Sequence, residues 1–262
     1  MKLKKSTLFF YSLAEMPINI ALFPILVFIP KFYTGEMGVP LALAANIILA
    51  VRIFDVFTDP IVGYINDRTN TKWGRRRPWI AMATPLLMVS IYMLFIPPEG
   101  AGALHLFLWM FLLSIATTML IIPYYAWGAE LSPDYNERSR ITGWRSISGV
   151  VGSLSAQLIP TIALVFFGLG GSTNVLYIVG IASVIIMPIC VFLTVSKVPE
   201  SKDYIKSNIS PIKGFKIMLE NSPFKRLIMA FMFGGIAFSI TIPLYLFFIT
   251  YVLKAEEMAI FM

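Results

Sequence analysis

The stretch RIFDVFTDP, from Arg52 to Pro60, places an arginine and two aspartates inside one of the most apolar parts of the chain. Of the 262 residues, 58% are hydrophobic and only 13% are charged, and the mean hydropathy is +0.79. Soluble domains are roughly half apolar and about a quarter charged. The composition therefore predicts an all-α integral membrane protein, in which charges within an apolar stretch require an explanation.

Seven stretches are long and apolar enough to cross a bilayer as helices, since a span needs about 20 residues. They cover residues 8–33, 40–66, 79–97, 103–129, 141–168, 174–196 and 225–253. An eighth stretch begins at Glu256 and is cut off at Met262. A polar segment rich in lysine separates the sixth stretch from the seventh. The pattern predicts an N-terminal six-helix bundle at 1–198, a cytoplasmic linker at 199–223 and the incomplete start of a C-terminal bundle at 224–262.

Basic residues gather on one side of these spans. Loops on that side hold Arg68, Lys72 and the arginines at 75–77, whereas the opposite side holds Lys31 and Lys254. Positively charged loops are retained in the cytoplasm, so we expect a multi-pass protein of the plasma (inner) membrane with a cytoplasmic N-terminus. The net charge of +7 then reflects topology, and no nucleic-acid partner is predicted.

The three charges of the opening stretch lie on one face of the second span. Arg52, Asp55 and Asp59 are spaced by three and four residues, which places them within about 60° of one another on a helix. Asp55 lies about 22 Å from the outer end of the span, at membrane depth. Lipid against that face would cost roughly 2.5 to 3.5 kcal/mol per charge. The face must therefore line a bundle interior or a water-filled cavity.

Two carboxylates one helical turn apart need a cation, a proton or an arginine beside them. Arg52 leaves a local charge of about minus one, which a single Na⁺ or H⁺ would cancel. We therefore predict a coupling ion, Na⁺ or H⁺, with Asp55 and Asp59 as the metal ligands if it is Na⁺, and no other cofactor. Thr58 and hydroxyls on a facing helix could complete the oxygen shell. The alternative is a structural ion-pair network in which the two aspartates hold Arg52 and Arg145.

Further polar groups at membrane depth suit a polar organic ligand. Glu15 and Asn19 are one turn apart, beside Pro17, which should loosen that helix. Tyr125 offers an aromatic face, and the guanidinium of Arg145 donates hydrogen bonds. The sequence contains no nucleotide-binding loop, zinc motif or nucleophile constellation, so no enzyme is predicted. The residues predicted to bind substrate are Glu15, Asn19, Arg52, Tyr125 and Arg145.

The motif RIFDVFTDPIVGYINDRTNTKWGRRRPW, together with YSLAEMPIN near the start, resembles the glycoside-pentoside-hexuronide:cation symporters of the major facilitator superfamily, which include the melibiose carrier. The resemblance extends to about residue 200 and implies a helical bundle of that superfamily. It implies a cation site made of Asp55, Thr58, Asp59 and Thr118. It also implies that Arg145 takes part in sugar recognition, and that the inner side is gated by Asp67, Arg75, Arg76 and Arg77.

The chain departs from the melibiose carrier at the sugar site. Asn19 and Ile121 stand where that carrier has two acidic residues, and Tyr125 stands where it has a stacking tryptophan. The predicted substrate is therefore a sugar, glycoside or related small polar organic solute, but not melibiose itself. Two alternatives remain open: a truncated, non-transporting remnant that acts as a membrane sensor or assembly subunit, and a symporter of an amphipathic, lipid-like solute. A complete transporter would also need the missing C-terminal half.

Overall fold

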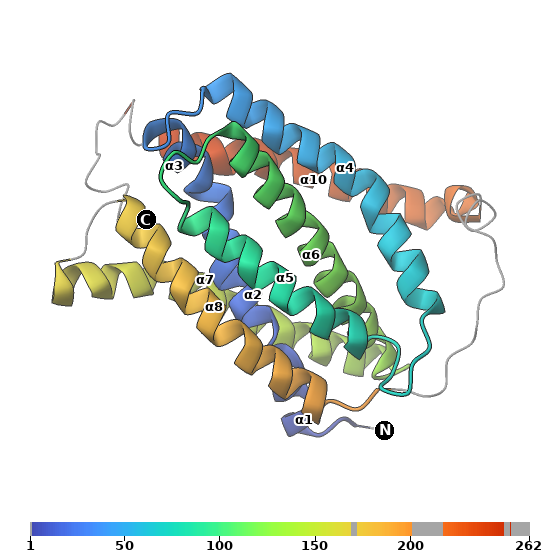
Figure 1. Ribbon diagram of the computed structural model, residues 1–262. Helices are drawn as coiled ribbons and strands as arrows, with labels where there is room; N and C mark the ends of the chain where they lie inside the picture. The colour runs from blue at the N-terminus through green and yellow to red at the C-terminus, as the bar shows by residue number, and fades with distance from the viewer. Residues whose placement is uncertain (1, 169–171, 201–216, 249–251, 253–262) are drawn as a thin grey trace. The chain divides into compact units, whose positions relative to one another are not determined.

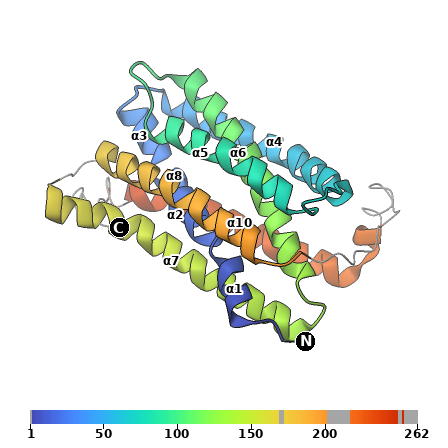
Figure 2. The same cartoon turned by 60° about the horizontal axis from the view of Figure 1, so that its bottom comes forward.

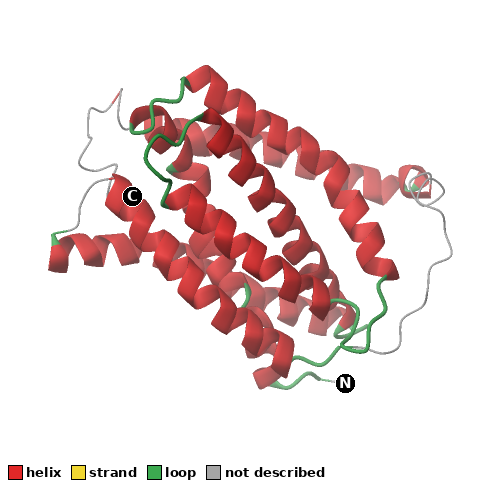
Figure 3. Ribbon diagram, viewed as in Figure 1, coloured by secondary structure: helices red, strands yellow, loops and turns green. Residues whose placement is uncertain are grey.

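The computed structural model describes residues 2–168, 172–200, 217–248 and 252, and the regular elements within them are helices (Figures 1 and 3). The chain divides into two units, residues 1–202 and 203–262. In the second unit, helix α10 (Ser222–Phe247) covers most of the seventh predicted span. The eighth predicted stretch, which starts at Glu256, lies outside the described residues.

The first unit contains helices α1 to α8. Their bounds are α1 (Lys5–Ser12), α2 (Glu15–Val27), α3 (Ile29–Gly35), α4 (Leu41–Arg68), α5 (Arg77–Phe95), α6 (Ala103–Glu130), α7 (Tyr135–Phe167) and α8 (Ser172–Lys197). In the described part of the chain, six stretches are long and apolar enough to cross a membrane. They correspond to the first six predicted spans, with ends shifted by a few residues.

The first predicted span is confirmed in part: residues Lys5–Val27 are long and apolar enough to cross a membrane, and the structure divides residues 8–33 into α1, α2 and α3. The first break lies where Pro17, which has no N–H, cannot donate to the carbonyl of Leu13. The N–H of Met16 bonds to that carbonyl instead, at 3.3 Å. Pro30 lies just after the end of α2 and has the same effect there. Each interruption therefore lies next to a proline.

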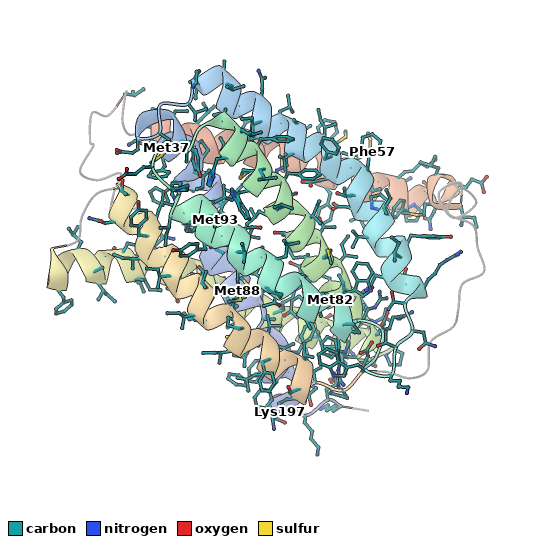
Figure 4. The ribbon with its side chains drawn as sticks, viewed as in Figure 1. Met37, Phe57, Met82, Met88, Met93 and Lys197 are labelled. Carbon is teal, nitrogen blue, oxygen red and sulfur yellow. The ribbon has the colours of Figure 1, made fainter. Side chains whose placement is uncertain are left out.

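Figures 1 and 2 show how the long helices pair within the first unit. Helix α6 lies between α4 and α5, and α2 packs against both α7 and α8. Phe57 on α4 and Met82 on α5 are exposed apolar side chains, as expected for helices that face lipid (Figure 4). We call the end of the unit where α1 begins and α8 ends, marked by Lys197 in Figure 4, the basic end.

A pair of tyrosines fastens α1 to α6 in the core. The rings of Tyr11 and Tyr124 stack with their centroids 4.7 Å apart. Each hydroxyl donates to the main-chain oxygen of the other residue, at 3.0 Å from Tyr11 and 2.8 Å from Tyr124. Both side chains are fully buried, so each polar tip is satisfied without water.

Glycines let α7 approach α2 closely. A side chain at Gly152 would place its Cβ on the main-chain oxygen of Met16 and 3.1 Å from the Cβ of Asn19. One at Gly149 would lie 3.2 Å from Nδ2 of Asn19. Small residues at a helix interface permit this backbone contact. The contact brings the polar residues of α7 against the polar face of α2.

We expect the change Gly152→Ala to lower the thermal unfolding midpoint of the purified protein, because the new methyl group meets backbone rather than a flexible side chain. Overpacking of this kind costs roughly 1 to 3 kcal/mol. The matched control is Gly143→Ala on the same helix, where nothing lies within 4 Å, and it should leave the midpoint unchanged or slightly higher. Equal midpoints for the two variants, measured by intrinsic fluorescence in detergent, would contradict the α2–α7 contact.

Candidate functional site

Two aspartates of α4 accept hydrogen bonds from two hydroxyl side chains of α6. The carboxylate of Asp55 accepts a hydrogen bond from Ser114, and that of Asp59 accepts one from Thr118 at 2.7 Å. Asp59 follows Asp55 by four residues on α4, and Thr118 follows Ser114 by four residues on α6. One turn of α4 therefore matches one turn of α6, and the two helices run in the same direction. We call these four residues the carboxylate–hydroxyl ladder.

Arg52 completes the charged face of α4. Its Nη1 lies 3.2 Å from Oδ2 of Asp55, with 56% of the arginine side chain exposed and 18% of the aspartate side chain exposed. Asp59 is exposed as well. One arginine and two aspartates give this face of α4 a formal charge of minus one. This face therefore has one more acidic than basic side chain.

The ladder forms part of the wall of a cavity of about 300 Å³ between α2, α4 and α6. The polar residues of its lining are Arg52, Asp55, Asp59, Ser114, Thr117 and Thr118, and the rest of the wall is apolar. Oxygen donors of this kind suit a hard cation such as Na⁺. In the described ranges no group of three or more His, Cys, Asp or Glu side chains could hold a metal, so an ion here would depend on two carboxylates and on hydroxyls.

Thr58 is placed differently from its predicted neighbours. Its hydroxyl donates to the main-chain oxygen of Phe54 at 3.2 Å, and Thr58 is absent from the lining of the cavity. Spacing explains the difference, because Thr58 is 100° around the helix from Asp59. In this structure the hydroxyl beside Asp55 comes from Ser114 on α6 instead.

A second polar group lies on α2, α6 and α7. The guanidinium carbon of Arg145 lies 3.9 Å from the ring centre of Tyr125, whose hydroxyl donates to Oε1 of Glu15 at 3.1 Å. The amide of Asn19 donates to the main-chain oxygen of Glu15 at 2.9 Å. We call these four residues the Glu15 cluster. The structure thus brings together four of the five residues predicted to bind substrate, while Arg52 lies with the ladder.

The alternative of a structural ion-pair network requires the two aspartates to hold Arg52 and Arg145, and the structure shows only the first of these pairings. Arg52 pairs with Asp55, but Arg145 stacks on Tyr125 and its charge acts on Glu15. The reason is the helix packing: Arg145 lies on α7, which packs against α2, whereas the aspartates face α6 from α4. The structure therefore does not show the pairing of Arg145 with the aspartates that this alternative requires.

The predicted gating residues meet in one ion-pair network at the basic end. Arg75 and Arg76 lie 2.5 and 2.6 Å from Oε1 of Glu130, and Arg76 also lies 2.8 Å from Asp67. Burial disfavours the charged form of Arg76. The hydrogen bond and charge of Glu130, together with those of Asp67, outweigh this and raise the pKa of Arg76 above its ordinary value. The network therefore ties the end of α4 and the start of α5 to the end of α6.

The chain just after α8 joins the same network. Oε1 of Glu200 accepts hydrogen bonds from the main-chain N–H groups of Arg75 and Arg76, at 2.6 and 2.7 Å. Both N–H groups directly precede the first turn of α5, so the carboxylate lies at the N-terminus of that helix, where the helix dipole favours a negative charge. Arg77 in turn donates to the main-chain oxygen of Val198 at 2.6 Å. The basic end thus joins four helices.

Sequence reasoning missed Ser114, Glu130 and Glu200. Ser114 precedes Thr118 by four residues, as Asp55 precedes Asp59, and that matched spacing could have found it. Glu130 is an acidic residue at the end of a span on the same side as the three arginines, so charge complementarity could have suggested it. Glu200 carries no such signal, because its role depends on the end of α8 meeting the start of α5.

The fold and these two clusters define a helical membrane transport protein. The family model described as "MFS/sugar transport protein" matches residues 10–262, so the chain belongs to this family of the major facilitator superfamily. This membership confirms the resemblance to the glycoside-pentoside-hexuronide:cation symporters, and the family is one of transporters rather than enzymes.

The relatives that are named for their substrates differ in the solutes they carry. The isoprimeverose transporter of Lactiplantibacillus pentosus is 28% identical over 228 residues, which cover 82% of this chain and 46% of the relative. The glucuronide carrier protein homolog of Escherichia coli strain K12 is 29% identical over 142 residues, which cover 53% of this chain and 31% of the relative. The sodium-dependent lysophosphatidylcholine symporter 1 of Mus musculus is 27% identical over 266 residues, which cover 86% of this chain and 49% of the relative. The chain spans about half the length, or less, of these curated relatives.

We expect Glu130→Gln to lower the thermal unfolding midpoint, because it leaves the buried Arg76 facing a neutral amide. Loss of one partner of a buried ion pair costs about 3 to 5 kcal/mol, and Asp67 should compensate for part of it. Glu99→Gln, at an exposed position, is the control that removes the same charge and should leave the midpoint unchanged. Equal midpoints for the two variants in detergent would show that the network at the basic end contributes little.

Proposed function

We propose that this chain supplies the N-terminal bundle of a secondary active symporter that couples Na⁺ or H⁺ to the movement of a sugar, glycoside or related small polar solute. The observation that carries the proposal is the carboxylate–hydroxyl ladder on the wall of the cavity between α2, α4 and α6. A net negative charge at this depth is costly unless a cation reaches it.

Neutralisation of the ladder would drive the coupling. Without an ion, Asp55, Asp59 and Arg52 carry a charge of minus one, which resists transfer into a closed, water-free state. One Na⁺ or H⁺ at the ladder removes that charge and lowers the cost of closure. The ion thereby shifts the population toward the closed state, and bound substrate shifts it further.

The two clusters share helices, which offers a route between ion and substrate. Helix α6 carries Thr118 of the ladder and Tyr125 of the Glu15 cluster, about two turns apart and roughly 10 Å along the axis. Helix α2 carries Glu15 and also lines the cavity. A change in the position of α6 on ion binding would therefore reach Tyr125 directly. This placement supports a substrate site at the Glu15 cluster.

The exposed charges of α4 support the proposal that a second bundle packs against this face. Arg52 and Asp59 cannot face lipid at low cost, so this face needs water or another bundle against it. We assign residues 1–198 to the N-terminal bundle, 199–223 to the linker and 224–262 to the start of the C-terminal bundle. With the N-terminus in the cytoplasm, the network of Asp67 and Arg75 to Arg77 would act as the inner gate.

We expect Asp59→Asn and Asp55→Asn each to abolish cation-stimulated uptake, because the ladder then no longer needs a cation for neutrality. The measurement is solute uptake into membrane vesicles from cells that express the complete reading frame, with and without an imposed Na⁺ or proton gradient. Insertion is checked by the amount of monodisperse protein recovered from membranes. Gradient-driven accumulation equal to that of the wild type in either variant would overturn the proposal.

We expect Ser114→Ala to weaken cation dependence more than Thr58→Val does. Ser114 donates to Asp55 at the cavity, whereas the Thr58 hydroxyl donates to its own helix. Loss of a hydrogen bond to a charged group costs about 1.5 to 3 kcal/mol, so the half-saturating cation concentration should change about tenfold or more for Ser114→Ala. A larger change for Thr58→Val would favour the site implied by the resemblance over the one built on α6.

An amphipathic solute is the second candidate. The cavity wall is mostly apolar and includes Ile121, and one relative is named as a lysophosphatidylcholine symporter. The two candidates are separated by uptake of a panel of neutral sugars, glycosides, uronides and lysolipids, each with and without Na⁺. Accumulation of a lysolipid alone would replace the sugar in the proposal and leave the ion coupling in place.

A further inference from the structure

We propose that Glu15 determines substrate charge: it cancels the charge of Arg145 and makes the Glu15 cluster a site for a neutral, polyhydroxylated solute rather than an anionic one. The inference rests on the proposed function and names the substrate class for that same site. It begins with an unpaired oxygen. Glu15 is 9% exposed, and its Oε1 accepts from Tyr125, while its buried Oε2 has no hydrogen-bond partner among the described residues.

A buried carboxylate oxygen without a partner is costly, and a ligand hydroxyl would satisfy it. The amide of Asn19 donates one of its two hydrogens to the main-chain oxygen of Glu15. Tyr125 is also committed to Oε1. The arrangement thus leaves an acceptor for a ligand hydroxyl beside the Tyr125 ring, one face of which Arg145 covers.

Packing holds Glu15 against α7. A Cβ at Gly149 would lie 3.3 Å from Cγ of Glu15, so the α7 backbone lies directly against the acidic side chain. Arg145 is one turn before Gly149 on the same helix and stacks on Tyr125, which bonds to Glu15. Glu15 and Arg145 therefore approach the same ring, one at its hydroxyl and the other at its face.

The charge balance then decides what can bind. The formal charges of Glu15 and Arg145 sum to zero, whereas Arg52 pairs with Asp55 of the ladder. A neutral solute keeps the sum at zero. A carboxylate brings a second negative charge beside the buried Glu15, and like charges repel. Without the Glu15 charge, the free guanidinium would instead favour a carboxylate, with which it forms strong paired hydrogen bonds.

The test uses two probes that differ at a single carbon: 4-nitrophenyl β-D-glucopyranoside, which carries a hydroxymethyl group, and 4-nitrophenyl β-D-glucuronide, which carries a carboxylate. Binding of each to the purified protein is measured by calorimetry at saturating Na⁺ and neutral pH. The wild type should prefer the glucoside. Glu15→Gln should shift the affinity ratio toward the glucuronide by about tenfold or more. Glu15→Asp and the exposed-site control Glu99→Gln should each shift it less than threefold.

A charge cycle keeps the test decisive if Glu15→Gln does not fold. Arg145→Gln removes the positive charge and should shift the ratio further toward the glucoside. The double variant restores neutrality and should return the ratio close to that of the wild type. Recovery of monodisperse protein from membranes shows that each variant is folded.

An unchanged ratio in folded Glu15→Gln, or a wild type that binds the glucuronide better, would overturn the inference. Binding of neither probe to the wild type would also overturn it, because the cluster would then not be a glycoside site of this kind. The proposed function is judged separately, by the loss of cation-stimulated uptake in Asp59→Asn. Ion coupling can therefore stand while the assignment of Glu15 falls.

Discussion

Charge placed at bilayer depth must be matched by protein, water or ions, and the first unit of this chain is arranged around that constraint. The aspartates of α4 cannot face lipid, so they turn to α6, where Ser114 and Thr118 donate to them at the same one-turn interval. This pairing fixes the register of two parallel helices. It also leaves a negative charge that no described neighbour of Asp59 cancels. Architecture and proposed coupling thus follow from the same pair of contacts.

The two arginines at membrane depth contact different polar groups. Arg52 forms an ion pair with Asp55 of the ladder, and Arg145 stacks on Tyr125 of the Glu15 cluster. If both arginines had paired with the aspartates, the face of α4 would carry no net negative charge and would have no need of a cation. The close contact of α7 with α2, made possible by Gly149 and Gly152, keeps Arg145 away from them. Small residues in one interface therefore influence the chemistry of another.

Much of this could be predicted from the sequence, because hydropathy and periodicity report directly on which helices cross a membrane and which faces carry charge. The stripe of Arg52, Asp55 and Asp59 is of this kind. The breaks in the first predicted span depend on which carbonyl each proline leaves without a donor, and length alone does not reveal them. Glu200 acts only because distant helix ends meet. Partners across helices are set by packing, which a single sequence does not specify.

The capping of α5 by Glu200 bears on how the chain carries mechanical load. Gly74, at a φ of +119°, lies so close to the Glu200 carboxylate that a side chain there would collide with it. Trp127 adds a hydrogen bond to the main-chain oxygen of Pro199 at 3.0 Å. Tension applied through the later residues would therefore be borne first by the turn before α5 and by the end of α6. The segment that leaves α8 is thus held both to the start of α5 and to α6, the helix that carries Thr118.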